Sequence, residues 1–179
     1  MSDLSIEEYL VHYLPGLVGR YLKEDPVPNM DGTLFTLQIS ITGEKNLVFG
    51  ITIRDSKQIT VTPGGLENPQ VALEIPEGII QPLVKMISSL TSRGQYDMLK
   101  GTKGSMDMEI NLPDGQDMQA RMVFNGADEP NCKMTGSSID LGKIVSGLLD
   151  PTRAFMQGQI KLFGDLSFAI RLTQLVPKK

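Results

Sequence analysis

The sequence predicts a fold that combines β-hairpins with helices, and three observations support this prediction. Apolar and polar residues alternate in two stretches, residues 35–53 and 106–124, each with a turn in its middle. A short strand-like segment and then apolar residues at helical spacing follow each stretch. A helical pattern precedes the first stretch, and a further strand and helix close the chain. The expected order is therefore helix, then hairpin, strand and helix twice, then a closing unit.

Length and composition favour one globular domain over residues 1–179. The chain is 40% apolar and 21% charged, as ordinary globular proteins are, and its length suits a single core. Within this domain we distinguish an N-terminal helical segment (1–25), a first copy of the repeated unit (33–92), and a second copy with the C-terminal unit (104–176).

The N-terminal segment predicts a helix. Ser5 and Glu8 fit a capping box, and apolar residues then recur at helical spacing. The pair Pro15-Gly16 is expected to break or bend this helix. Prolines and a glycine in residues 24–32 predict a loop that leads into the sheet.

Residues 35–53 predict a hairpin with one buried face. Apolar residues occupy every second position on both sides of a turn at residues 43–46. The expected inward residues are Phe35, Leu37, Ile39, Ile41, Leu47, Phe49, Ile51 and Ile53. A third strand, residues 58–62, is expected after a turn at residues 55–57.

The same pattern recurs 71 residues later, which indicates a partly duplicated hairpin-strand-helix unit. This shift keeps all eight inward positions apolar or small, and it falls to 61 downstream because the second copy lacks the third strand. The helical stripe Ile80, Leu83, Val84 and Ile87 falls on Leu141, Ile144, Val145 and Leu148. Ser137 with Asp140 supplies a capping signature for the second of these helices. Chance alternation in two unrelated hairpins is the alternative.

The last part of the chain, residues 131–176, combines several short elements. It holds a short strand (131–134), a helix ending at Gly147, the pair Asp150-Pro151, a strand (158–162), the pair Gly164-Asp165 and a final helix. This order resembles the closing half of the sterol carrier protein type 2 family of non-specific lipid-transfer domains. Residues 33–90 resemble the opening half more loosely, with residues 91–130 as an additional hairpin and helix segment between the halves.

The resemblance implies an α+β fold in which helices cover one face of a mostly antiparallel sheet. It also implies an apolar tunnel for a fatty acyl chain, an acyl thioester or a sterol-like lipid. The candidate lipid-binding residues are Leu141, Ile144, Val145, Leu148, Phe155, Met156, Ile160, Leu162, Phe168, Leu172, Met108 and Met122. For each of them, an ordinary core position is the alternative, because a helix that is apolar over a wide face suits either environment.

Methionines gather in or beside the second copy, at Met98, Met106, Met108, Met118, Met122 and Met134. Unbranched thioether side chains repack at low cost, so this set predicts a pliable pocket wall, with adaptable core packing as the alternative. Lys161, Lys133 and Arg153 are candidates for holding a carboxylate or phosphate at the tunnel mouth, with solvated surface charges as the alternative.

The chain shows few features of an enzyme. His12 is the only histidine, and no G-x-S-x-G turn, P-loop or dinucleotide fingerprint occurs. One histidine and one cysteine, Cys132, do not suffice for a zinc site. We therefore expect no catalytic residues, no metal and no cofactor. Cys132 is expected to be a buried apolar side chain.

Charge and hydropathy narrow the expected partners and location. The net charge of −4 and the absence of a long basic run argue against nucleic-acid binding. No run of 18 apolar residues occurs, so we expect no stable membrane insertion. The acidic start and the single cysteine favour a cytoplasmic protein. The alternative function is a scaffold module with a closed pocket, which pairs with another chain or with itself as a homo-oligomer through hairpin edges.

Overall fold

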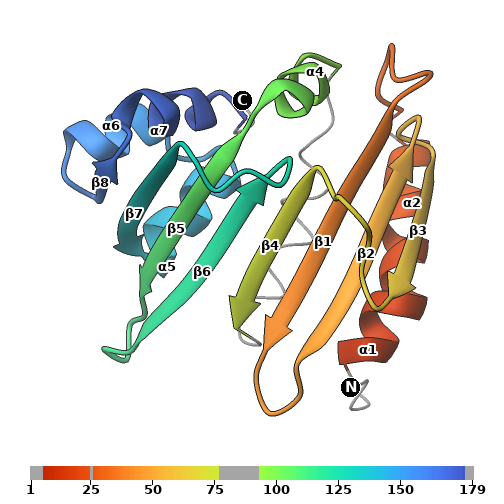
Figure 1. Ribbon diagram of the computed structural model, residues 1–179, viewed down its shortest axis with the longest axis horizontal. Helices are drawn as coiled ribbons and strands as arrows, with labels where there is room; N and C mark the ends of the chain where they lie inside the picture. Colours follow the sequence, from red (N-terminus) through yellow and green to blue (C-terminus); the bar gives the residue numbers. More distant parts are fainter. Residues whose placement is uncertain (1–5, 25, 77–92, 176–179) are drawn as a thin grey trace.

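The computed structural model describes residues 6–24, 26–76 and 93–175. Eight strands form one mixed sheet (Figure 1). In spatial order they are β3 (Gln58–Pro63), β2 (Leu47–Arg54), β1 (Leu34–Thr42), β4 (Val71–Pro76), β6 (Asp117–Phe124), β5 (Gly104–Asn111), β7 (Asn131–Ser137) and β8 (Ile160–Gly164). Neighbouring strands are antiparallel except in the pairs β1–β4 and β5–β7. The mostly antiparallel sheet is confirmed, and it is mixed.

The two predicted hairpins share a topology. In each, the next strand along the chain pairs in parallel with the first strand of the hairpin: β4 with β1, and β7 with β5. Phe35 pairs with Ile53, whereas the corresponding Met106 pairs with Met122, two residues short of the position given by the shift of 71. A difference of two residues keeps the same side chains on the inner face. Duplication itself stays a prediction, and the stripe at residues 80–87 lies outside the described residues.

Strand β6 joins the two halves of the sheet. Its residues 121–124 pair antiparallel with residues 71–74 of β4. In the second half, β8 pairs antiparallel with β7 on the side away from β5. The pair β4–β6 in the first half thus corresponds to the pair β7–β8 in the second. The sheet continues without a break from β3 to β8.

The N-terminal helix consists of α1 (Ile6–Glu8), the π-helical segment η1 (Tyr9–Tyr13) and α2 (Leu14–Glu24). Of the break or bend predicted at Pro15-Gly16, the break is wrong, because α2 runs through both residues. The amide of Leu14 bonds to the carbonyl of Tyr9, five residues back, so the turn before Pro15 is widened and accommodates its ring. The buried residues Leu10, Leu14, Val18 and Leu22 form the stripe that packs on the core.

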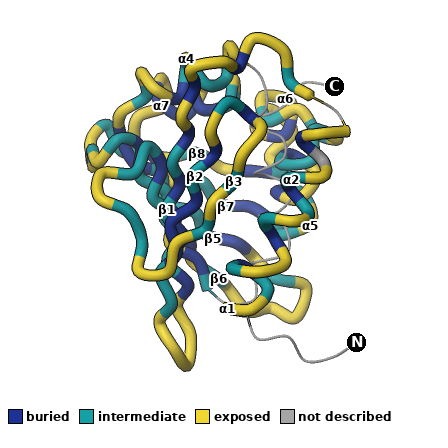
Figure 2. Tube along the Cα trace, turned by 90° about the vertical axis from the view of Figure 1, so that its right-hand side faces the viewer, coloured by how far each residue is buried: buried dark blue, intermediate teal, exposed yellow. Residues whose placement is uncertain are grey.

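The remaining described helices are α4 (Arg93–Gly101), α5 (Ser138–Val145), α6 (Pro151–Met156) and α7 (Leu166–Thr173). The predicted cap is confirmed: Ser137 Oγ accepts a hydrogen bond from the amide of Asp140 and donates to its carboxylate. Asp150 and Asp165 cap α6 and α7 by accepting hydrogen bonds from the amides of Arg153 and Phe168. Helices α2 and α5 lie on the same face of the sheet (Figures 1 and 2).

The core lies between that inner face and the helices. In the first half of the sheet the inner side chains are almost fully enclosed: Leu37 is 1% exposed, and Ile39 and Ile51 are 0% exposed. Figure 2 shows the buried residues running through the sheet and the helix faces turned to it. The opposite, open face of the sheet carries polar and charged side chains.

Candidate lipid-binding site

Five half-buried methionines lie on the inner face of the second half of the sheet. They are Met106, Met108, Met118, Met122 and Met134, and we call them the methionine surface. Met106 is opposite Met122 in one strand pair, and Met108 is beside Met134 in another. Four of the five equivalent residues of the first half, Phe35, Leu37, Ile51 and Leu73, are buried, so this part of the inner face is the more open one.

Helices α5 and α7 and strand β8 supply apolar side chains to the same layer. Most of the predicted lipid-binding residues lie there, in one contiguous cluster: Leu141, Ile144, Ile160, Leu162, Phe168, Leu172, Met108 and Met122. Leu162 pairs with Met134 at the edge of the methionine surface. Val145 is half-buried on α5. The fold thus brings these residues together on one side of the sheet.

Three predicted residues lie on the surface instead. Leu148 is 67% exposed, Phe155 42% and Met156 81%. On α6 it is Ala154 that faces the core, at 0% exposure. The next two residues turn away from the core, because each helical residue is rotated by about 100° from the one before it.

Two hollows formed by described residues lie elsewhere. One, of about 20 Å³, lies between α2, β1, β2 and α4, and has room for roughly one water molecule. The other, of about 400 Å³, lies among charged side chains of β4–β7. Of the twelve predicted residues, Met108 alone lines either of these two hollows. A tunnel between α7 and the strands stays a prediction.

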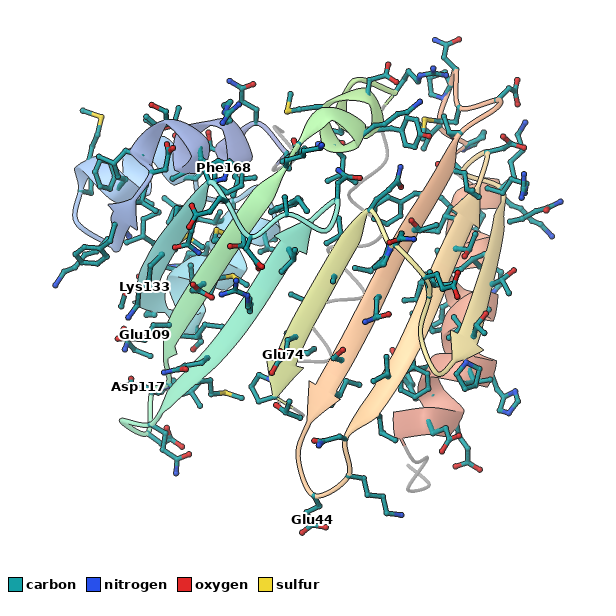
Figure 3. All side chains as sticks on the ribbon, in the orientation of Figure 1. Glu44, Glu74, Glu109, Asp117, Lys133 and Phe168 are labelled. Carbon is teal, nitrogen blue, oxygen red and sulfur yellow. The ribbon has the colours of Figure 1, made fainter. Side chains whose placement is uncertain are left out.

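Most of the charged side chains around the larger hollow are in ion pairs. Arg121 contacts Asp107 at 2.7 Å and Asp128 at 2.9 Å, and Lys133 contacts Glu109 at 2.6 Å. Hydrogen bonding to Asp128 is the main cause that raises the pKa of Arg121 above its ordinary value. Figure 3 shows Lys133 and Glu109 on the open face. Lys133 therefore lies on the opposite side of the sheet from the methionine surface, with its charge already paired.

Cys132 lies on the inner face of β7, within the core. Its side chain is 0% exposed, so the expected buried position is confirmed. Burial, and then the charges of Asp165 and Asp107, raise the pKa of the thiol to about 11 from the ordinary 9.0. The reactive thiolate is therefore scarce at neutral pH.

We expect Cys132 to resist alkylation in the folded protein. Incubation with iodoacetamide at neutral pH should leave the mass unchanged, whereas the same treatment in urea should add one label, detected by mass spectrometry. Because folding raises this pKa, the unfolded chain loses its thiol proton first, and stability should fall as the pH rises from about 9 to about 11. Fast labelling of the native protein would contradict the burial.

Known proteins resemble the part of the chain that holds this site. Residues 87–177, just over half of the chain, match the model of the SCP-2 sterol transfer family. The chain belongs to this family. The match includes β5 and β6, so the prediction that residues 91–130 are an additional segment is wrong, and they lie within the region that matches the family. Within the matched region, β5 and β6 form a hairpin, β7 pairs in parallel with β5, and β8 pairs antiparallel with β7.

Individual curated proteins are similar in sequence to parts of this SCP-2 family member. It is 33% identical over 88 residues to hydroxysteroid dehydrogenase-like protein 2 of Bos taurus, covering 45% of this chain and 21% of that protein. Over 118 residues it is 28% identical to the Pongo abelii protein of the same name, covering 62% and 28%. The chain thus spans between a fifth and a third of the length of these curated relatives.

Among solved structures, the chain is similar to sterol carrier protein 2 like 2 from Aedes aegypti, with 19% identity and a TM-score of 0.37, covering 54% of this chain and 98% of that one. It is also similar to the apo form of sterol carrier protein 2 from Yarrowia lipolytica, with 16% identity and a TM-score of 0.37, covering 44% and 76%. Among the described residues, no helix has the length and apolar character needed to cross a bilayer.

Proposed function

We propose that this chain is a non-catalytic, cytoplasmic lipid carrier that holds a fatty acyl chain, an acyl thioester or a sterol-like lipid against the methionine surface. The observation that carries the proposal is the position of this surface. It lies within residues 87–177, the region that matches a sterol transfer family, and its five methionines are half-buried, whereas most inner residues of β1, β2 and β4 are buried.

The energetics of burial favour an apolar ligand there. Each methylene removed from water contributes about 0.8 kcal/mol, so about ten methylenes supply about 8 kcal/mol before the costs of ordering ligand and side chains. No specific polar contact is required for this, which agrees with the pairing of Arg121 and Lys133 on the other face. Flexible thioether side chains would let one surface fit ligands of different shape.

The proposal that the chain is not an enzyme is supported by its few reactive groups. The only histidine, His12, is exposed on the N-terminal helix, which packs on the first half of the sheet. Cys132 is buried as a protonated thiol. Within residues 6–24, 26–76 and 93–175 no three histidine, cysteine or acidic side chains are grouped to hold a metal ion.

Organic extraction of the natively purified protein, followed by mass spectrometry, tests the carrier proposal. We expect a lipid in near-stoichiometric amount, and we expect a fluorescent fatty acid to bind and to be displaced by natural fatty acids. An empty extract together with no fluorescent binding would contradict carriage. Purification from a second expression host is the control against carry-over of one abundant lipid.

Replacing Met108, Met122 and Met134 together with leucine is expected to narrow the range of chain lengths that bind. Leucine has a similar volume but fewer rotatable bonds, so the surface should fit fewer ligand shapes. Displacement by fatty acids of increasing length measures this range. The matched control is Met30→Leu, at a buried methionine beside the first half of the sheet and away from the methionine surface. A folded triple variant that binds the same range of chain lengths as the wild type would contradict the prediction of a pliable wall.

The alternative function, a scaffold module, is favoured by the position of the two hollows, neither of which lies between α7 and the strands. The sequence predicted that such a module pairs through the edges of its hairpins, but these strands have no free edge. Both strands of each hairpin are paired on both sides, so the free edges within the described sheet belong to β3 and β8. Homo-oligomers would therefore form through those edges, and sedimentation of the lipid-free protein tests for them.

A further inference from the structure

Exposed apolar side chains are concentrated in the C-terminal unit. Nine large apolar residues of the described chain are exposed, and seven of them lie between residues 139 and 170. Six come from α6, β8, α7 and the segment before α6: Leu148, Phe155, Met156, Phe163, Leu166 and Ile170. We call these six the terminal apolar surface. Scattered exposed apolar residues are normal, but a concentration of them marks a contact with another molecule.

The elements that carry this surface are packed together. Helix α6 contacts both β8 and α7, and α7 contacts β8. All three lie at one end of the molecule (Figure 1). On α7, Leu166 and Ile170 are one turn apart and exposed, whereas Phe168 and Leu172 are buried on the other side. This helix is therefore apolar on two faces, and its outer face has no cover within the described residues.

Basic side chains lie on the same three elements. Arg153, Lys161 and Arg171 are exposed, and none of them pairs with a carboxylate of the described residues. The nearby Asp150 and Asp165 instead accept hydrogen bonds from helix N-terminal amides, each at 2.8 Å. Arg171 lies over the ring of Phe168, 5.8 Å from its centroid, but this contact leaves its charge without an anionic partner. Exposed positive charge thus accompanies exposed apolar groups, in a chain whose net charge is −4.

We propose that the terminal apolar surface docks on an anionic lipid bilayer. The apolar side chains would enter the boundary between headgroups and acyl chains, while the three cations would face lipid phosphates. A second copy of the chain fits less well, because a twofold interface would bring the same cations of both copies together. This inference deepens the proposed function, since it identifies the membrane as the place where the carried lipid is loaded or released.

Cosedimentation of the full chain with lipid vesicles tests the proposal. We expect binding to vesicles of phosphatidylcholine with phosphatidylglycerol, and weaker binding to phosphatidylcholine alone. The variant Leu166→Gln with Ile170→Gln keeps helix-forming residues but should bind roughly tenfold more weakly or worse. The variant Arg153→Gln with Lys161→Gln should lose roughly fivefold for each charge removed, on the anionic vesicles only.

Tyr13→Gln is the matched control. Tyr13 is 49% exposed on the N-terminal helix, at the other end of the sheet, so its replacement should leave binding unchanged. Binding of the Leu166/Ile170 variant at the wild-type level would overturn the proposal. A wild-type dimer that this variant dissociates, without vesicle binding, would show that a second copy covers the surface. Fluorescent fatty acid binding without vesicles is measured in parallel, so failure of the carrier function is seen separately.

Discussion

Replacing Gly104 with alanine is expected to destabilise the protein by about 3 kcal/mol or more. Gly104 begins β5 with φ +132°, a conformation that residues with a Cβ rarely adopt. An added Cβ would lie 2.4 Å from the carbonyl oxygen of Pro130 and 2.7 Å from Cζ of Phe168. The amide of Ser105 holds that same carbonyl at 2.9 Å, so the backbone cannot easily give way. Urea unfolding followed by circular dichroism measures the change.

The control for this prediction is Gly115→Ala in the turn of the second hairpin. Gly115 also has a positive φ, of +84°, but no atom lies within 4 Å of the position of its Cβ. Its replacement should therefore cost only the backbone strain, about 1 kcal/mol. Equal losses for the two variants would show that the close approach of Pro130 and Phe168 does not determine the stability of the β5 start.

Phe168→Ala is expected to cost about 3 to 5 kcal/mol. The ring is 1% exposed, and it meets the ring of Phe124 edge-on with centroids 6.2 Å apart. Its loss would leave a cavity between α7 and the sheet, next to the apolar layer that holds the predicted lipid-binding residues. If lipids enter this layer, a fatty acid should raise the melting temperature of the variant more than that of the wild type. Thermal unfolding with and without the ligand measures both effects.

Phe163→Ala provides the comparison for Phe168. Phe163 is 53% exposed on β8, so its truncation should change stability by about 0.5 kcal/mol or less. A small loss at Phe168 would mean that the space under α7 closes when the ring is removed. An unchanged response to fatty acid in a destabilised variant would place the ligand away from this part of the core.

The local parts of the fold could be predicted from the sequence. Alternation with period two gave both strands of the first hairpin, and the pairing of Phe35 with Ile53 follows from the turn between them. Ser137 and Asp140 were recognisable as a cap because their bonds involve only the first turn of α5. Strand β8 begins two residues later than predicted, since Gly158, with φ +71°, still belongs to the turn that ends α6.

The long-range arrangement could not be predicted in this way. Nothing in the alternation of residues 71–76 or 117–124 indicates that β4 and β6 are neighbours, because each pattern specifies only which face is buried. Residue type also fails to separate core from surface within the C-terminal unit. Phe155 and Phe168 are equally apolar, yet one is 42% exposed and the other 1%. Only the orientation of α6 and α7 against the sheet decides which of them is enclosed.

Because β6 pairs with both β5 and β4, the stability of one half of the molecule depends on that of the other. A fragment ending after β4 and a fragment beginning at α4 would each carry a strand with bare amide and carbonyl groups along one side. Such strands recruit foreign chains and promote aggregation. Melting of the intact protein should accordingly be a single cooperative event, in which damage to the N-terminal half lowers the resistance of the SCP-2 region to proteolysis.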